Sequence, residues 1–243
     1  MNTTKRKEIS VISREWDDIC CQRQEAIISG KDISYIQVIE PTIVEELKGF
    51  KSKRLLDVGC GTGVLTNTLK EYSQNCTGID VSEKSILIAK NNYQKDGLLF
   101  IQTAMKDYKC DQLYDICVSC MALMSDPDYV DTLKSIRKAL ERNGVLLVLI
   151  THPCFWAKYW KIDDKEWFNY EEEIYIEHDF SISLVKSIGK ATYIHRPLEQ
   201  YYMALSRAGY TIEKIKEAYP VGELPDGYKY DFPRFMLFRC RAN

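Results

Sequence analysis

Short apolar runs alternate with amphipathic segments along most of the chain. The apolar runs have the length of strands, and the segments between them have the spacing of helices with one apolar face. Strands that alternate with helices pack as a parallel sheet covered on both faces. We therefore predict an α/β fold with a three-layer, doubly wound, mostly parallel sheet. The predicted strands are 54–58, 76–80, 98–102, 114–119 and 145–151, and the predicted helices are 39–47, 63–72, 83–93 and 129–141, the last one stopped by Asn143-Gly144.

The pattern changes before and after this alternation. Residues 10–29 form a polar amphipathic lead that contains Trp16, and we expect helices here that cover a cleft. Residues 152–196 hold three of the four tryptophans, and strand-like pieces near 173–178 and 190–195 predict a small antiparallel addition. A helix that starts at Pro197 and strands at 210–218 and 234–241 then restore the regular order.

Three glycines follow the first predicted strand, in Asp57-Val58-Gly59-Cys60-Gly61-Thr62-Gly63. Glycine allows a tight turn and a close approach of the backbone to a ligand. The dinucleotide fingerprint G-x-G-x-x-G would need glycine at position 64, where Val64 stands. The spacing resembles motif I of class I (Rossmann-like) S-adenosylmethionine (SAM)-dependent methyltransferases, in which this loop wraps the methionine part of SAM. The alternative is a strand-to-helix turn in another α/β protein.

A second candidate cofactor-binding feature is Asp80, which ends the next predicted strand. An acid at this place can accept hydrogen bonds from both ribose hydroxyls of an adenosine. Ser82 then serves as the expected N-cap of the helix 83–93. Proteins that bind NAD also place an acid here, so Asp80 supports nucleoside binding but does not distinguish SAM from NAD. The alternative role for Asp80 is a helix cap or a solvated loop acid.

The resemblance also implies the organisation of the chain. The expected parts are an N-terminal helical cap (1–37), a SAM-binding core (38–151), a substrate-binding insertion or lid after the fifth strand (152–196), and a C-terminal completion of the sheet with an antiparallel last strand (197–243). Ligands of open α/β sheets bind at the carboxyl ends of the strands. The expected cofactor-binding residues are Asp57, Gly59, Cys60, Gly61, Thr62, Gly63, Asp80, Val81, Ala104, Met105, Cys120 and Met121.

Two histidines are the candidate catalytic residues. Methyl transfer from a sulfonium is an in-line displacement, which needs a base only when the acceptor must lose a proton. His152 ends a strand before Pro153 and is expected to point into the cleft, where it could accept a proton at neutral pH. His195 precedes the returning helix and is the second candidate. For both, the alternative is a packing or hydrogen-bonding role, and His178 is interpreted as a surface residue.

The aromatic residues of the insertion suit a planar or apolar acceptor, through stacking and burial. The alternative is a small aromatic core. The segments His152-Pro153-Cys154-Phe155 and His195-Arg196-Pro197-Leu198 look similar to those of bacterial small-molecule methyltransferases. We therefore expect methyl transfer to an O or N atom of a small-molecule acceptor, planar or aromatic. The expected substrate-binding residues are Trp156, Trp160, Tyr170, Tyr193 and Arg196.

Composition limits the other possibilities. A chain of 243 residues with 45% hydrophobic residues can bury a full core. Its net charge of −2 makes nucleic acid an unexpected partner. No apolar stretch approaches the roughly 20 residues of a membrane span, and the polar N-terminus lacks the apolar region of a signal peptide. Nine scattered cysteines suit a reducing compartment, so we expect a cytoplasmic monomer or homodimer.

The pair Cys117 and Cys120 has C-x-x-C spacing but lies on a predicted strand, where the two thiols face opposite sides. No second such pair completes a metal site, so SAM, with S-adenosylhomocysteine (SAH) as its product, is the expected cofactor and no metal is expected. Two other functions stay open: a methyltransferase that acts on RNA or protein, and a SAM-binding protein without catalysis.

Overall fold

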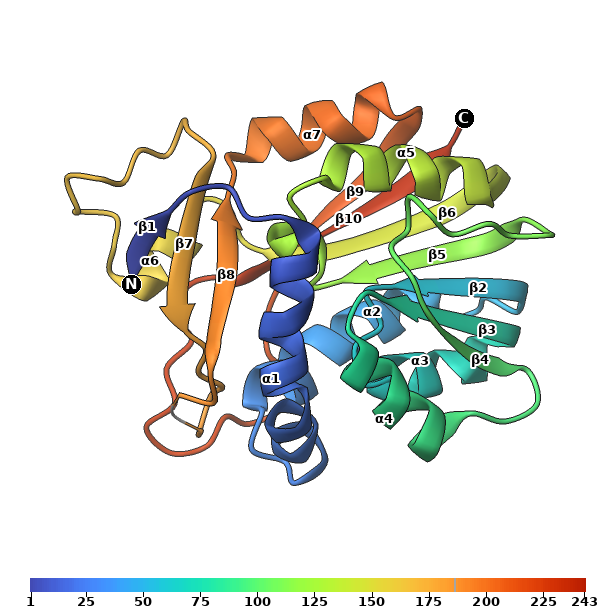
Figure 1. Cartoon of the computed structure of the whole chain (residues 1–243), viewed down its shortest axis with the longest axis horizontal. Helices are drawn as coiled ribbons and strands as arrows, with labels where there is room; N and C mark the ends of the chain where they lie inside the picture. Colours follow the sequence, from blue (N-terminus) through green and yellow to red (C-terminus); the bar gives the residue numbers. More distant parts are fainter. Residues whose placement is uncertain (186) are drawn as a thin grey trace.

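The computed structural model describes residues 1–185 and 187–243. Its centre is a seven-stranded sheet with the order β4-β3-β2-β5-β6-β10-β9, in which β10 runs antiparallel to both of its neighbours. The predicted doubly wound, mostly parallel sheet with an antiparallel last strand is confirmed (Figure 1). The strands are β2 (Ser52–Val58), β3 (Ser73–Asp80), β4 (Leu98–Gln102), β5 (Tyr114–Cys120), β6 (Leu140–Thr151), β9 (Tyr210–Ala218) and β10 (Phe235–Ala242).

Helices cover both faces of this sheet, as the three-layer prediction requires (Figure 1). On one face lie α2 (Glu40–Leu47), α3 (Val64–Leu69) and α4 (Glu83–Tyr93), whose apolar side chains join one buried cluster with the sheet. On the other face, α5 (Tyr129–Ala139) and α7 (Leu198–Arg207) join a second cluster. The strands between them are buried on both sides, which explains why β6 is apolar from Val145 to Ile150.

Most element bounds agree with the sequence pattern, but those of two helices and of the strand β6 differ. The predicted helix 63–72 is an α-helix only as far as Leu69, followed by a 3₁₀ turn over Lys70–Tyr72. The predicted helix 129–141 ends at Ala139, because Leu140 already pairs with Tyr114 as the first residue of β6. Asn143 takes a left-handed φ of 64° inside β6. The Asn143-Gly144 pair therefore lies inside a strand, where the pairing of β6 with β5 shifts register, instead of stopping the helix.

A second, three-stranded antiparallel sheet stands beside the carboxyl ends of the large one (Figure 1). Two of its strands, β7 (Ile174–Asp179) and β8 (Lys190–His195), are the predicted antiparallel addition. The third, β1 (Asn2–Thr4), comes from the N-terminus and was not predicted. The same region contains α6 (Trp156–Trp160), a π-helical turn over Tyr35–Ile39 and a 3₁₀ turn over Leu123–Ser125.

The long helix α1 (Ile9–Ile28) lies between the two sheets (Figure 1). Its Asp17 carboxylate accepts hydrogen bonds from the Ser82 hydroxyl, at 2.6 Å, and from the Lys84 N–H, at 3.1 Å. Toward the small sheet, the Thr192 hydroxyl donates to Glu15 over 3.0 Å. These bonds fix α1 over the loop that follows β3. Among the described residues, no helix is both long enough and apolar enough to cross a membrane.

Candidate functional site

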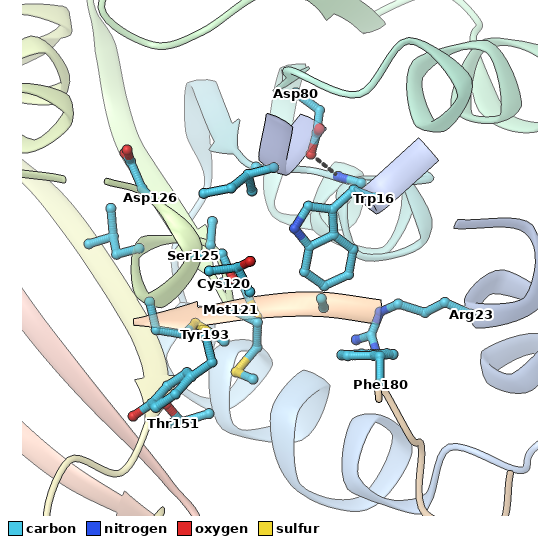
Figure 2. Close-up of a pocket in the computed structure, with 18 of the residues that line it drawn as sticks. Trp16, Arg23, Asp80, Cys120, Met121, Ser125, Asp126, Thr151, Phe180 and Tyr193 are labelled. Atoms are coloured by element: carbon cyan, nitrogen blue, oxygen red, sulfur yellow. Dashed lines mark hydrogen bonds between the residues drawn. The ribbon is translucent and has the colours of Figure 1, made fainter. Parts of the chain in front are cut away.

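A cavity of about 610 Å³ opens where the carboxyl ends of β2, β3, β5 and β6 face α1 and the small sheet. Figure 2 shows part of its lining. Trp16, Arg23 and Phe180 lie on one side, and Cys120, Met121, Thr151 and Tyr193 lie on the other. The cavity therefore has walls from both the core and the covering segments.

The glycine loop after β2 forms one end of the cavity, and its three glycines differ in the space around the backbone. Gly59, Gly61 and Gly63 all have positive φ values, of 77°, 53° and 81°. A Cβ at Gly59 would lie 2.4 Å from the Ala122 Cβ, and one at Gly63 would lie 2.8 Å from the Phe100 ring. At Gly61 no other atom lies within 4 Å of such a Cβ. Gly61 thus leaves open space directly beside the backbone, as a ligand cradle requires.

Asp80 ties this loop to the end of β3. Its two carboxylate oxygens accept hydrogen bonds from the Gly61 N–H and the Ser82 N–H, each over 2.8 Å (Figure 2 shows the first). Each oxygen keeps a further lone pair, so the side chain can still accept from two hydroxyls. Burial raises the pKa of Asp80, and the two N–H donors oppose that shift. The geometry fits the ribose diol of an adenosine.

Asp57 lies deeper, below the glycine loop. One carboxylate oxygen accepts a hydrogen bond from the Thr66 hydroxyl over 2.7 Å, and the other has no partner among the described residues. Burial raises the pKa of Asp57 to about 7. A cation bound nearby would favour the charged carboxylate, because opposite charge lowers the pKa of an acid.

The structure brings eleven of the twelve expected cofactor residues to the cavity wall. The exception is Gly63, which forms the N-terminal boundary of α3 and packs against Phe100. The eleven are Asp57, Gly59, Cys60, Gly61, Thr62, Asp80, Val81, Ala104, Met105, Cys120 and Met121.

The two candidate catalytic histidines do not line the cavity. The backbone of β6 continues in extended form, with the His152 N–H donating to the Arg234 carbonyl over 2.7 Å. Successive side chains of a strand point to opposite faces, so Thr151 faces the cavity and His152 faces away from it. The His152 Nε2 lies 3.5 Å from the Glu217 carboxylate.

His195 is likewise held outside the cavity. Its Nε2 lies 3.0 Å from the Tyr170 carbonyl, and its ring packs against Phe168 at 4.8 Å between centroids. Burial lowers the pKa of both His152 and His195. These placements support the packing and hydrogen-bonding alternatives for both residues and give no geometric support to the predicted base.

Of the five expected substrate-binding residues, Trp156, Trp160 and Tyr193 line the cavity. Tyr170 does not, and its hydroxyl accepts a hydrogen bond from the Leu198 N–H over 3.1 Å. Arg196 is fully buried outside the cavity.

Arg196 instead holds the 3₁₀ turn Leu123–Ser125, whose residues line the cavity. Its guanidinium donates to the carbonyls of Leu123 and Asp126 over 2.9 and 2.8 Å, and it pairs with Glu173 at 2.6 Å. The role of Arg196 in the structure is therefore to position the loop after β5.

Several lining residues were not predicted from the sequence. Arg23 on α1 points into the cavity beside Phe180, with its guanidinium 5.7 Å from the ring centroid, and lies 3.3 Å from the buried Asp32 (Figure 2 shows Arg23 and Phe180). Its position seven residues after Trp16, on the same helix face, was the available signal. The interpretation of His178 as a surface residue is wrong, because this side chain is buried and lines the cavity.

Comparison with known proteins agrees with this site. A family profile described as a methyltransferase domain matches residues 50–183, more than half of the chain. The chain therefore belongs to this family of methyltransferase domains, and the predicted resemblance to class I SAM-dependent methyltransferases is confirmed. SAM is the methyl donor that membership of this family implies.

Similar proteins include both curated sequences and solved structures. A ubiquinone biosynthesis O-methyltransferase of Actinobacillus pleuropneumoniae is 29% identical over 140 residues, which cover 54% of this chain and 56% of that protein. The chain thus spans little more than half the length of such relatives. A SAM-dependent methyltransferase from Mesorhizobium loti shares 20% identity with a TM-score of 0.61, over 83% of this chain and 96% of that one. The DhpI-SAM-HEP complex shares 18% identity with a TM-score of 0.68, over 99% of this chain and 100% of that one. At these identities the two structures show the fold alone.

Proposed function

We propose that this protein transfers the methyl group of SAM to an oxygen or nitrogen atom of a small, planar acceptor. The observation that carries the proposal is that one cavity contains both the glycine loop with Asp80 and a wall of aromatic side chains from the insertion. Its volume of about 610 Å³ lies within the range of small-molecule sites. The name of the curated relatives favours oxygen as the methylated atom.

One end of the cavity would bind the cofactor, and the other end would orient the acceptor. At one end, Gly61 leaves room for the methionine part of the cofactor, and Asp80 would accept the ribose hydroxyls. Arg23 acts to lower the pKa of the Cys120 thiol at this end, and its N–H donors that bind no other described residue would suit the cofactor carboxylate. When bound, SAM supplies an electrophilic methyl group on a sulfonium.

At the other end, Trp156, Trp160 and Tyr193 would orient the acceptor by stacking and burial. Alignment of the acceptor atom with the methyl group and exclusion of water are the main contributions that such a site makes to an in-line displacement. We assign this role to the insertion 152–196 together with the cap 1–37, because both cover the core 38–151, whose sheet the segment 197–243 completes.

The test is to incubate the protein with SAM and a panel of phenols, catechols and aromatic amines, and to measure SAH formed for each acceptor. We expect SAH formation that depends on the acceptor and is lost in Asp80→Ala. SAH binding without turnover on any acceptor would favour the non-catalytic alternative. Retention of RNA at low salt, together with methylation of that RNA, would favour the nucleic-acid alternative instead.

A further inference from the structure

We propose that His178 selects the acceptor by accepting, at its Nε2 atom, a hydrogen bond from a hydroxyl group of an aromatic compound. This inference rests on the proposed function, because it concerns the acceptor end of the same cavity. It names a residue outside the expected cofactor-binding set and a class of acceptor, the phenols.

The first step is the protonation of the imidazole ring. The Nδ1 atom of His178 lies 3.2 Å from the backbone carbonyl of Asp179. A carbonyl can only accept, so the proton of the neutral ring is on Nδ1 and the lone pair is on Nε2. Burial lowers the pKa of His178 to about 4, so the ring is neutral near pH 7. The side chain therefore presents a hydrogen-bond acceptor.

The second step is access to that atom. His178 is buried and lines the cavity, and in the described part of the chain only its Nδ1 atom makes a hydrogen bond. Its Nε2 atom, although it has no hydrogen-bond partner there, is not closed off from solvent. Because the residue has the cavity on one side, we infer that a ligand in the cavity can reach Nε2.

The third step is the surface around His178. The indole of Trp160 packs against two polar side chains, with ring centroids 4.4 Å from His178 and 5.1 Å from Tyr193. His178 pairs with Ala191, two residues before Tyr193, so the two side chains share one face of the β7–β8 hairpin. A planar ring against this face would have apolar contact with Trp160 and polar partners in His178 and Tyr193.

The fourth step is the charge at this end of the cavity. Two charged groups act on the His178 ring: the Asp179 carboxylate raises its pKa and the N-terminal ammonium lowers it, so they oppose each other. A cationic ammonium group would lose its hydration in this buried site at a much higher cost than a neutral hydroxyl. This favours a phenolic hydroxyl over an ammonium group as the donor to His178.

The experiment measures binding of two probes to the SAH-loaded protein by calorimetry. Catechol carries O–H donors, and 1,2-dimethoxybenzene has the same ring and oxygens without them. We expect the wild-type protein to bind catechol about tenfold more tightly, the effect of one hydrogen bond. His178→Phe keeps a flat ring and should remove this preference, with no change in SAH affinity. Tyr175→Phe, also on β7 but outside the cavity lining, is the control and should keep the preference.

Several outcomes would overturn the inference: equal affinities of the two probes in the wild type, no catechol binding at all, or a preference that survives in His178→Phe. If these occur while SAH still binds and methyl transfer is observed, the proposed function stands and only the role of His178 falls. If His178→Phe does not fold, ¹⁵N spectra of wild-type protein with labelled histidine decide the question. Catechol, and not its dimethyl ether, should then shift an unprotonated ring nitrogen.

Discussion

Replacement of Arg196 by Met tests whether this residue positions the cavity wall. The variant leaves the Leu123 and Asp126 carbonyls and the Glu173 carboxylate without their partner. An unsatisfied buried polar group costs about 1–3 kcal/mol. Glu173 keeps 32% of its side chain exposed, so water can solvate it and its share is small. Together with the lost contact to the Tyr129 ring, 4.0 Å from the guanidinium carbon, the expected loss is about 3–5 kcal/mol.

The assay is urea unfolding of wild-type and Arg196→Met protein, followed by calorimetry with SAH. Domains of this kind are stable by about 5–15 kcal/mol, so the variant should still fold at low temperature. We expect SAH to bind about tenfold more weakly, because the 3₁₀ turn at 123–125 lines the cavity. Arg196→Lys keeps the charge but loses the planar fork, and should give an intermediate loss of stability. A change in unfolding free energy below about 1 kcal/mol for Arg196→Met would refute this account of the residue.

Three further predictions concern single side chains. Gly59→Ala should destabilise the protein more than Gly61→Ala in urea unfolding, since only the first would place a Cβ 2.4 Å from Ala122; equal losses would contradict the geometry. Asp80→Asn should weaken SAH binding about tenfold to hundredfold in calorimetry, and unchanged affinity would exclude the ribose contact. His178 has a pKa of about 4 in the folded protein against an ordinary 6.5, so the unfolded chain binds more protons below pH 6.5 and stability is lost as pH falls. The unfolding free energy of His178→Phe, measured relative to that of wild type, should therefore rise by about 2 kcal/mol from pH 7 to pH 5. If this difference does not change with pH, the imidazole titrates normally.

The large sheet and the cofactor end of the cavity could be predicted because their signals are local. The apolar strands, the glycine loop and Asp80 lie within single βα units, and their positions at strand ends bring them together in any parallel sheet. The spacing of Gly59, Gly61 and Gly63 depends on the same local turn, so most of the residues expected there line the cavity.

The acceptor end could not be predicted in the same way, because it depends on contacts between distant segments. Strand β1 pairs with β7, which lies about 170 residues later in the chain. It has only three residues, which is too short for an alternating pattern to predict a strand. Which of the three histidines faces the cavity depends on the face of its strand to which each side chain points. A shift of one residue at the end of β6 would have exchanged Thr151 and His152 between the two faces. His178 reaches the cavity only through the register of the β7–β8 hairpin, which the sequence pattern does not specify.

The most direct test of the central claim, that this chain is a SAM-binding methyltransferase domain, compares SAH with NAD⁺ in equilibrium unfolding of the wild-type protein. SAH at about 100 times its dissociation constant should raise the unfolding free energy by about 2.7 kcal/mol. NAD⁺ at the same concentration should leave it unchanged, because Val64 stands where the dinucleotide fingerprint needs glycine. Stabilisation by NAD⁺ with none by SAH would contradict the account.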